Sequence, residues 1–386
     1  MIPRFALLCC TITFLSLPAS AAEKPGDQAK AIERALGRAG KNRPEIEKAL
    51  TDAPTEQRSG MEFLVANMPD ADLTSLQAKF LLENLDLAYQ ARTQLPWGKT
   101  IPDDIFFNNV LPYANVNESR DDWRKEMFDL CMPIVKECKT PGEAAQKINS
   151  TIFDKLKVKY STERKKADQS PRESMETGKA SCTGLSIILS DACRSMCVPT
   201  RIVGTPLWSN KRGNHTWVEI WDKTWHFTGA CEQDPNGLDR GWFVGEAAQA
   251  QKDVREHAIY ASSFKKTDVI FPLVWAPGRK DVFAENVTDR YTAKAAPKVK
   301  GVFVAIRVWQ PGKKDRVAAA VSIVDSGDAK ATFSGESRGN TADKNDILTF
   351  DLVPGREYVL KVGKDYEVKF KTEADKNLTL EVELSK

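Results

Sequence analysis

The chain has 386 residues, of which 41% are hydrophobic and 28% are charged. This composition is that of a globular protein, and it excludes a disordered or fibrous chain. The 56 lysines and arginines exceed the 53 aspartates and glutamates by three, a net charge of +3 that argues against a nucleic-acid partner. The length predicts two or three folded units.

The first 21 residues have the three parts of a secretory signal peptide. Arg4 precedes an apolar run, and Pro18-Ala19-Ser20-Ala21 supplies the small residues that precede a cleavage site. The apolar run is shorter than the roughly 18 residues that cross a membrane, and no later segment is comparable. We therefore expect a signal peptide over residues 1–21, cleavage after Ala21, a secreted or periplasmic protein, and no integral membrane segment in the mature chain.

The next region, residues 22–139, is predicted to be helical. Apolar residues recur there at helical spacing, as at Leu76 and Phe80, although a stretch rich in proline and aromatic residues interrupts the pattern near its end. Thr140 and Pro141 then form a helix start. A second domain is predicted from this point, over residues 140–275.

This second domain is predicted to contain one amphipathic helix followed by antiparallel strands. The sequence CTGLSIILSDACRSMCV, from residue 182, has a buried helical face and stops before Pro199. Three strand-like runs follow, TRIVGTPLW, HTWVEIW and TWHFTG, and Asp222-Lys223 joins the last two as a tight hairpin. The pattern indicates an α+β domain.

The remainder of the chain is predicted to be an all-β domain behind a linker. Residues 276–298 are polar and irregular, as expected of a linker. Residues 299–386 contain about seven short strand-like runs separated by turn signals, a pattern typical of a β-sandwich. The sequence leaves the role of this sandwich open, since adhesion, carbohydrate contact and spacing all suit it.

Six cysteines remain after the signal peptide, so an exported chain has the means to form disulfides. Cys131 and Cys138 are a candidate local pair, whereas Cys193 and Cys197, four residues apart on one helix, are too distant for an unstrained bond. No two CxxC pairs occur, and the three histidines lack zinc-ligand spacing. We expect no metal site and no cofactor.

Cys182 and His215 are the candidates for covalent chemistry. Cys182 stands at the start of the amphipathic helix, where the helix dipole and free backbone N–H groups favour a thiolate and offer an oxyanion site. His215 opens a strand that can pack against this helix start, and an imidazole there generates the thiolate. A small buried thiol without reactivity is the alternative interpretation of Cys182.

Four segments resemble the transglutaminase-like superfamily: GKASCTGLS, VPTRIV, NHTWVEIW and WHFTGACE. They lie between residues 140 and 250. The resemblance implies a papain-like α+β core that uses Cys, His and Asp, here preceded by a helical region and followed by a β-sandwich. The superfamily includes protein crosslinking enzymes, peptide N-glycanases, bacterial proteases and members without activity.

The third member of the expected triad departs from the family pattern. In the family a carboxylate follows the hairpin tryptophan by four residues, and four residues after Trp225 stands Gly229. Glu232 is the best substitute, because the hairpin register places it on the face of the predicted base. Asp234 and Thr228 are the alternatives.

Two functions remain open from the sequence. In the first, Cys182 attacks an amide carbonyl, His215 transfers the proton, Glu232 orients His215, and the backbone N–H of Cys182 binds the oxyanion. If water accepts the acyl group, the protein is a peptidase or an amidase, and this is the interpretation that we favour. If an amine accepts it, the protein is a crosslinking enzyme. The expected substrate is a protein, a peptide or a cell-envelope polymer. In the second, the domain is an inactive module that binds a peptide or a cell-envelope polymer, as the missing acid at Gly229 suggests. A disulfide between Cys182 and Cys231 is a third possibility, and it would remove the nucleophile.

Overall fold

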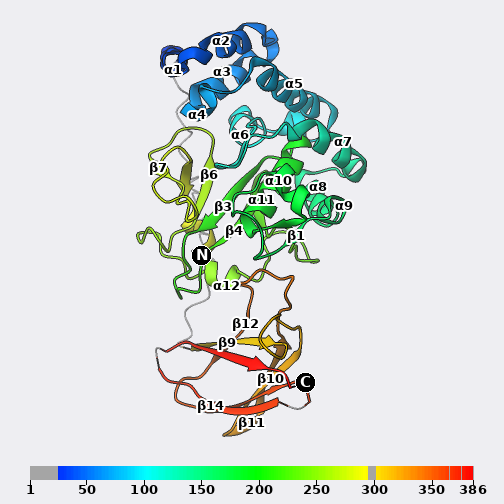
Figure 1. Cartoon of the computed structure of the whole chain (residues 1–386), viewed down its shortest axis with the longest axis vertical. Helices are drawn as coiled ribbons and strands as arrows, with labels where there is room; N and C mark the ends of the chain where they lie inside the picture. The colour runs from blue at the N-terminus through cyan, green and yellow to red at the C-terminus, as the bar shows by residue number, and fades with distance from the viewer. Residues whose placement is uncertain (1–24, 294–300, 365, 375, 386) are drawn as a thin grey trace, which may run out of the picture.

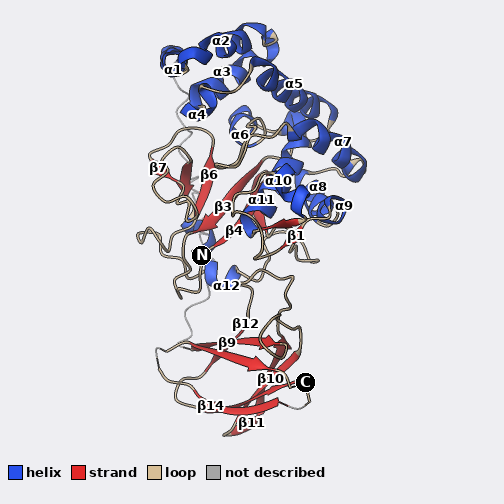
Figure 2. Cartoon of the chain, viewed as in Figure 1, coloured by secondary structure: helices blue, strands red, loops and turns tan. Residues whose placement is uncertain are grey.

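The computed structural model describes residues 25–293 and 301–385, except residues 365 and 375. Three parts follow one another along the long axis of the molecule: helices at one end, a mixed helix and sheet layer in the middle, and a β-domain at the other end (Figures 1 and 2). The predicted signal peptide lies outside the described residues. Among the described helices, none combines the length and the apolar composition needed to cross a bilayer.

The N-terminal helical region shares its core with the middle domain. Trp97 donates its indole N–H to the carbonyls of Met196 and Cys197, each at 3.1 Å, and one cluster of buried apolar residues extends from Ala35 to Ala284. The two predicted regions thus fold around one core. The helices of the N-terminal region, with three short 3-10 turns between them, are α1 (Pro25–Arg38), α2 (Arg43–Asp52), α3 (Arg58–Asn67), α4 (Asp70–Leu73), α5 (Ala78–Gln94), α6 (Asp103–Asn109) and α7 (Trp123–Val135).

The predicted amphipathic helix is α11 (Cys182–Ser195), the central helix of the middle domain. The side chain of Ser181 caps it by accepting the N–H of Gly184 at 3.1 Å. Its residues from Thr183 to Ser195 are all buried, because α7 covers one side and the sheet covers the other. The other helices of this domain are α8 (Pro141–Asn149), α9 (Ile152–Leu156), α10 (Pro171–Thr177), α12 (Val244–Ala247) and α13 (Thr288–Thr292).

An antiparallel six-stranded sheet packs against α11, with strand order β5-β4-β3-β6-β8-β7. The predicted hairpin is present, but its register differs from the one that a two-residue Asp222-Lys223 turn would set: Asp222 itself pairs with Thr224, and Lys223 between them adopts a left-handed φ of 64°. A short parallel pair, β1 (Lys159–Tyr160) and β2 (Lys179–Ala180), lies beside the start of α11. The strands of the sheet are β3 (Thr200–Thr205), β4 (His215–Asp222), β5 (Thr224–Thr228), β6 (Tyr260–Ser263), β7 (Val269–Ile270) and β8 (Phe283–Asn286).

The segment 276–298 is not the irregular linker that its polar composition predicts. Within it β8 pairs with both β6 and β7, and α13 follows directly. Thr288 accepts the backbone N–H of Ile259 at 2.9 Å, which ties this segment to the end of β6. The strand is only four residues long and half-buried, so it lacks the alternation that reveals longer strands. Residues 294–298 lie outside the described part.

The C-terminal domain is a β-sandwich of two sheets, β11-β10-β13-β14 and β12-β9-β15, as predicted. It has its own core, which includes Val304, Ile323 and Leu360. The long segment between β11 and β12, residues 337–347, rises from the sandwich to the middle domain (Figure 1). The seven strands are β9 (Val302–Trp309), β10 (Ala320–Asp325), β11 (Asp328–Glu336), β12 (Leu348–Leu352), β13 (Glu357–Val362), β14 (Tyr366–Lys371) and β15 (Leu378–Glu383).

Candidate active site

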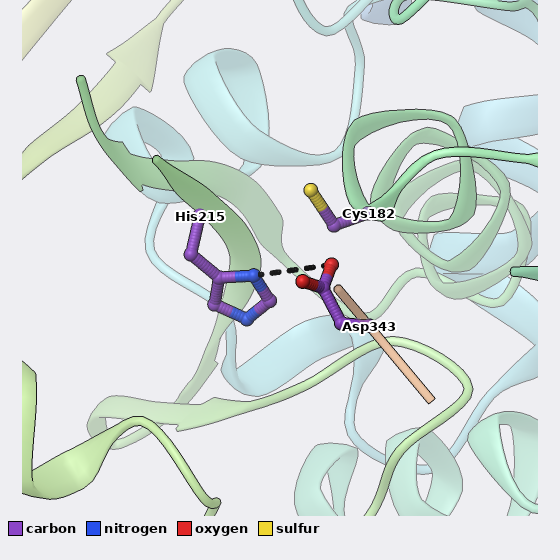
Figure 3. Close-up of side chains that lie close together, drawn as sticks. All are labelled: Cys182, His215 and Asp343. Carbon is purple, nitrogen blue, oxygen red and sulfur yellow. Dashed lines mark ion pairs between the residues drawn. The ribbon is translucent and has the colours of Figure 1, made fainter. Parts of the chain in front are cut away.

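The start of α11 is joined to the start of β4 by hydroxyl hydrogen bonds. Thr183 and Thr216 share a hydrogen bond of 3.0 Å between their Oγ1 atoms, and Ser186 donates to the carbonyl of Thr216 at 3.3 Å. The residues that precede the two threonines are Cys182 and His215. The fold therefore brings these two side chains together, as the sequence predicts. The thiol sulfur of Cys182 lies within 4.8 Å of an imidazole nitrogen of His215 (Figure 3).

Cys182 occupies the first position of α11 and is half-buried. The N–H groups of the first helical turn have no acceptor within the helix. The Ser181 cap satisfies the N–H of Gly184, so it leaves the N–H of Cys182 available. The helix start thus offers a donor to an oxyanion formed at the thiol, together with the positive end of the helix dipole.

The ring of His215 is fully buried in a box of aromatic side chains. Its centroid lies 4.6 Å from that of Trp242, 5.0 Å from that of Phe243 and 5.7 Å from that of Trp217. These rings exclude water from the imidazole and restrict its orientation. An ion pair with the imidazole is therefore little screened by solvent.

Glu232 approaches the imidazole, although the register of the hairpin does not place it there: Thr228 pairs with Val218, on the face opposite to His215, and the turn after β5 brings Glu232 back to the ring. Its Oε1 atom lies 3.1 Å from Nε2 of His215, and its Oε2 accepts the indole N–H of Trp242 at 2.8 Å. Both carboxylate oxygens are thus engaged. The arrangement is that of an acid that orients a histidine and stabilises its protonated form.

Gly229, which stands where the family has its acid, explains how Glu232 reaches this place. A Cβ built at Gly229 would lie 2.4 Å from Cγ and 2.6 Å from Oε1 of Glu232. The side chain of Glu232 therefore folds back into the volume that a side chain at position 229 would occupy.

The turn that returns Glu232 to the site is braced by Asn149 of α8. Asn149 donates to the carbonyl of Gly229 at 2.8 Å and accepts the N–H of Cys231 at 2.9 Å. Cys231 adopts a φ of 65°, a conformation that is strained for a residue with a side chain. The strain shows that the surrounding contacts hold this turn in place.

The two alternative orienting residues have other partners. Thr228 is buried on β5, where its hydroxyl oxygen accepts from Asn149 at 3.3 Å. Asp234 accepts the backbone N–H of Asn236 at 2.8 Å. Of the three residues considered from the sequence, Glu232 is the one that the structure places at the imidazole.

Asp343 also reaches the site, and the sequence analysis missed it. It belongs to the segment 337–347 of the sandwich, and only 3% of its surface is exposed. Its Oδ2 lies 3.7 Å from Nδ1 of His215 (Figure 3). The carboxylates of Asp343 and Glu232 therefore face opposite nitrogens of the ring. Its Oδ1 accepts the N–H of Asn345 at 2.8 Å. A loop aspartate of another domain carries no sequence signal for this role.

The two carboxylates determine the charge of His215. Burial by itself would lower the pKa of His215, but the charge of Glu232 and the hydrogen-bonding contacts with Asp343, Cys182 and Glu232 outweigh it, and the pKa lies well above its usual range. Burial raises the pKa of Glu232. Asp343 is buried too, yet its contacts with His215 lower its pKa. The raised pKa of His215 favours the protonated imidazole.

The structure brings together three side chains that can act as metal ligands. Atoms of Cys182, His215 and Asp343 all lie within 4.8 Å of one another, and thiolate, imidazole and carboxylate are zinc ligands. The expectation of no metal site rests on the spacing of possible ligands along the chain. That spacing does not reveal Asp343, which the sandwich contributes from a distant part of the sequence.

The cysteines do not form the disulfides considered from the sequence. All six cysteines of the described residues are unpaired, including Cys131, Cys138, Cys182 and Cys231. Cys131 faces Ser195 of α11, whereas Cys138 follows the end of α7 and is near Lys147. The two thiols of the predicted local pair thus have different neighbours, and Cys182 keeps a free thiol.

Comparison with known proteins places this site in a family. Residues 129–244 match the Transglutaminase-like superfamily. No curated protein matches the chain.

A candidate cysteine protease from Cytophaga hutchinsonii is similar in structure at 16% identity, with a TM-score of 0.28, over 36% of this chain and 46% of that one. Red sea bream transglutaminase is similar at 10% identity, with a TM-score of 0.31, over 72% of this chain and 66% of that one. The chain thus spans less than two thirds of each of these proteins. Residues 129–244, with Cys182, His215 and Glu232, therefore form a transglutaminase-like domain.

Proposed function

We propose that the protein is a thiol-dependent enzyme that hydrolyses amide bonds. The observation that carries this proposal is the buried imidazole of His215, which contacts the Cys182 thiol and has Glu232 at its Nε2 atom, 3.1 Å away. The raised pKa of His215 supports an imidazolium that accompanies a thiolate. The signal-like N-terminus supports action outside the cytoplasm, on a protein, a peptide or a cell-envelope polymer.

The reaction follows from the positions of the three side chains. The Cys182 thiolate adds to the amide carbon, and the backbone N–H of Cys182 donates to the oxygen that becomes negative. His215 then gives its proton to the amine as the carbon–nitrogen bond breaks, which leaves a thioester on Cys182. Water adds to the thioester with His215 as base, the carbon–sulfur bond breaks, and a carboxylate is released. Glu232 keeps the imidazole oriented throughout.

The first test is the reactivity of Cys182 toward iodoacetamide at pH 7, mapped by mass spectrometry. We expect Cys182 to be labelled faster than a thiol of the unfolded chain, and we expect this advantage to fall in His215→Gln and Glu232→Gln variants. Cys231 is the internal control, because burial raises its pKa to about 11. Labelling of Cys182 no faster than in the unfolded chain would contradict the proposal.

The second test separates hydrolysis from transfer to an amine. Wild type and Cys182→Ala are incubated with a denatured protein substrate, with and without a fluorescent primary amine. New amino termini or released ammonia that depend on Cys182 support hydrolysis. Incorporation of the amine in their place would make the protein a crosslinking enzyme, and neither outcome with a reactive Cys182 would favour the binding module.

A further inference from the structure

Asp343 separates two cavities that open on either side of Cys182. The first has a volume of about 260 Å³, and its walls include Leu185, Ala230 and Glu232. The second has about 170 Å³, and its walls include Val274 and Trp275. Tyr160, Cys182 and Asp343 line both cavities. Without Asp343 and its neighbours, the two cavities would join into one channel that passes the thiol.

The segment that carries Asp343 binds to the middle domain through groups that would suit a peptide. The backbone N–H of Lys344 donates to the hydroxyl of Tyr160 at 3.0 Å, and the side chain of Asn345 donates to the carbonyl of Asn214 at 2.6 Å. Gly213 has a φ of 127° and permits the close approach of Asn345, whose Oδ1 lies 2.8 Å from where a Cβ would stand. These acceptors become free when the segment leaves.

The segment is held rigidly on the sandwich side. The guanidinium of Arg316 donates to the carbonyls of Ala342 at 2.6 Å, Asp343 at 3.0 Å and Asp346 at 3.1 Å. Arg338 adds an ion pair with Asp346 at 3.0 Å. The sandwich therefore presents a preformed loop to the site.

The carboxylate of Asp343 also takes the partner that a thiolate needs. It lies 3.7 Å from Nδ1 of His215 and within 4.8 Å of the Cys182 sulfur. A second anion at this place competes with the thiolate for the single imidazolium. The segment thus opposes the reaction in two ways, by filling the channel and by occupying the positive charge.

We propose that residues 341–346 act as a pseudosubstrate: they fill the middle of one peptide-binding groove, whose two ends are the cavities, until a peptide displaces them. This inference rests on the proposed function, since it assigns the substrate class of the same site. Tyr160 and Asn214 then bind the main chain of the incoming peptide. Val274, which is 45% exposed, and Trp275 offer an apolar wall to its side chains.

The test compares two thiol reagents of different size on the full mature chain. Iodoacetamide is small, and acetyl-Ala-Ala-Ala chloromethyl ketone requires the groove. The variants are Asp343→Ala, which removes the carboxylate, and Arg316→Ala, which releases the loop from the sandwich without touching the groove. Lys361→Ala, in an exposed ion pair with Glu367, is the control. EDTA is present throughout, because the three donors at the site can capture zinc.

We expect both loop variants to accelerate inactivation by the peptide reagent by about ten- to a hundredfold, the effect of losing the ion pair with His215 in Asp343→Ala or the guanidinium hydrogen bonds to the loop in Arg316→Ala. The gain with iodoacetamide should be clearly smaller, and Lys361→Ala should behave as wild type. Equal gains with both reagents, or no gain, would overturn the groove, and slower labelling by both would show that Asp343 assists the thiolate. Failure of the proposed function is recognised separately, by an unreactive Cys182 toward iodoacetamide in wild type and all variants.

Discussion

The side chain of Glu232 lies where a side chain of Gly229 would lie, with its Cγ atom 2.4 Å from the Cβ position of residue 229. The two residues are therefore mutually exclusive sources of one carboxylate. The glycine is required by the glutamate that folds over it, and its presence does not by itself mean that the site has lost its acid.

This exclusion predicts a compensation between the two positions. Gly229→Asp should destabilise the protein by about 1–3 kcal/mol, because it overpacks a filled space, and it should slow the labelling of Cys182. Adding Glu232→Ala removes the overlapping atoms and should recover most of both losses. Chemical denaturation and iodoacetamide labelling measure the two effects. A double variant no better than Gly229→Asp would contradict the exclusion.

The pKa of His215 predicts how stability depends on pH. Because the folded protein keeps this imidazole protonated above the usual range, the ion pairs stabilise the fold fully below about pH 6.5, and this contribution is lost as pH rises through the elevated pKa. Above pH 6.5 the free energy of unfolding should therefore fall more steeply in wild type than in His215→Gln, by up to about 1.4 kcal/mol per pH unit. Denaturation followed by tryptophan fluorescence from pH 6 to 9 measures the difference, and parallel curves would refute it.

Asn149 is predicted to position Glu232 without contacting the imidazole. Asn149→Ala leaves the carbonyl of Gly229 and the N–H of Cys231 without their partner, which should cost about 1–3 kcal/mol of stability. It should also reduce the labelling advantage of Cys182 while Cys182 stays accessible. Gln146→Ala, at an exposed position of the same helix, should change neither. Loss of stability with an unchanged pH profile of labelling would show a purely structural role.

The unpaired thiols predict a simple count. The chain from Ala22, unfolded without reductant, should take up six alkyl groups, because all six described cysteines are free. In the folded state Cys182 should react alone at pH 7, since burial raises the pKa of Cys131 and Cys197 to about 12. Intact-mass spectrometry gives both counts. If the unfolded chain takes up four alkyl groups where six are expected, two of the cysteines form a disulfide.

The pairing of Cys182 with His215 and the domain that holds them could be predicted because their signals are local. The cap at Ser181, the apolar face of α11 and the hairpin at Lys223 are each encoded within a few residues. These predictions depend on periodicity and turn chemistry, which act over short stretches of chain.

Glu232 is predicted as the acid, but the hairpin register is not what places it at the ring. Thr228 pairs with Val218, on the face opposite to His215, and Glu232 returns to His215 through the turn that Asn149 holds.

Asp343 could not be predicted, because its position depends on how two separately packed cores dock. It follows His215 by more than a hundred residues, in a segment with no periodic pattern. β8 was missed for a related reason: two of its four residues, Glu285 and Asn286, are polar, and Glu285 is accommodated there by an ion pair with Arg201 at 2.8 Å. Tertiary partners decide both cases, and a single sequence does not display them.

The sandwich and the rest of the protein should melt as two units. Residues 25–293 contain two buried apolar clusters and the sandwich has a third of its own, so heating should produce two heat-absorption peaks. If the smaller sandwich melts first, Asp343 leaves while Cys182, His215 and Glu232 remain folded. There would then be a temperature interval in which Cys182 is labelled faster than in the intact protein, because partial melting of the sandwich exposes the thiol of the neighbouring domain.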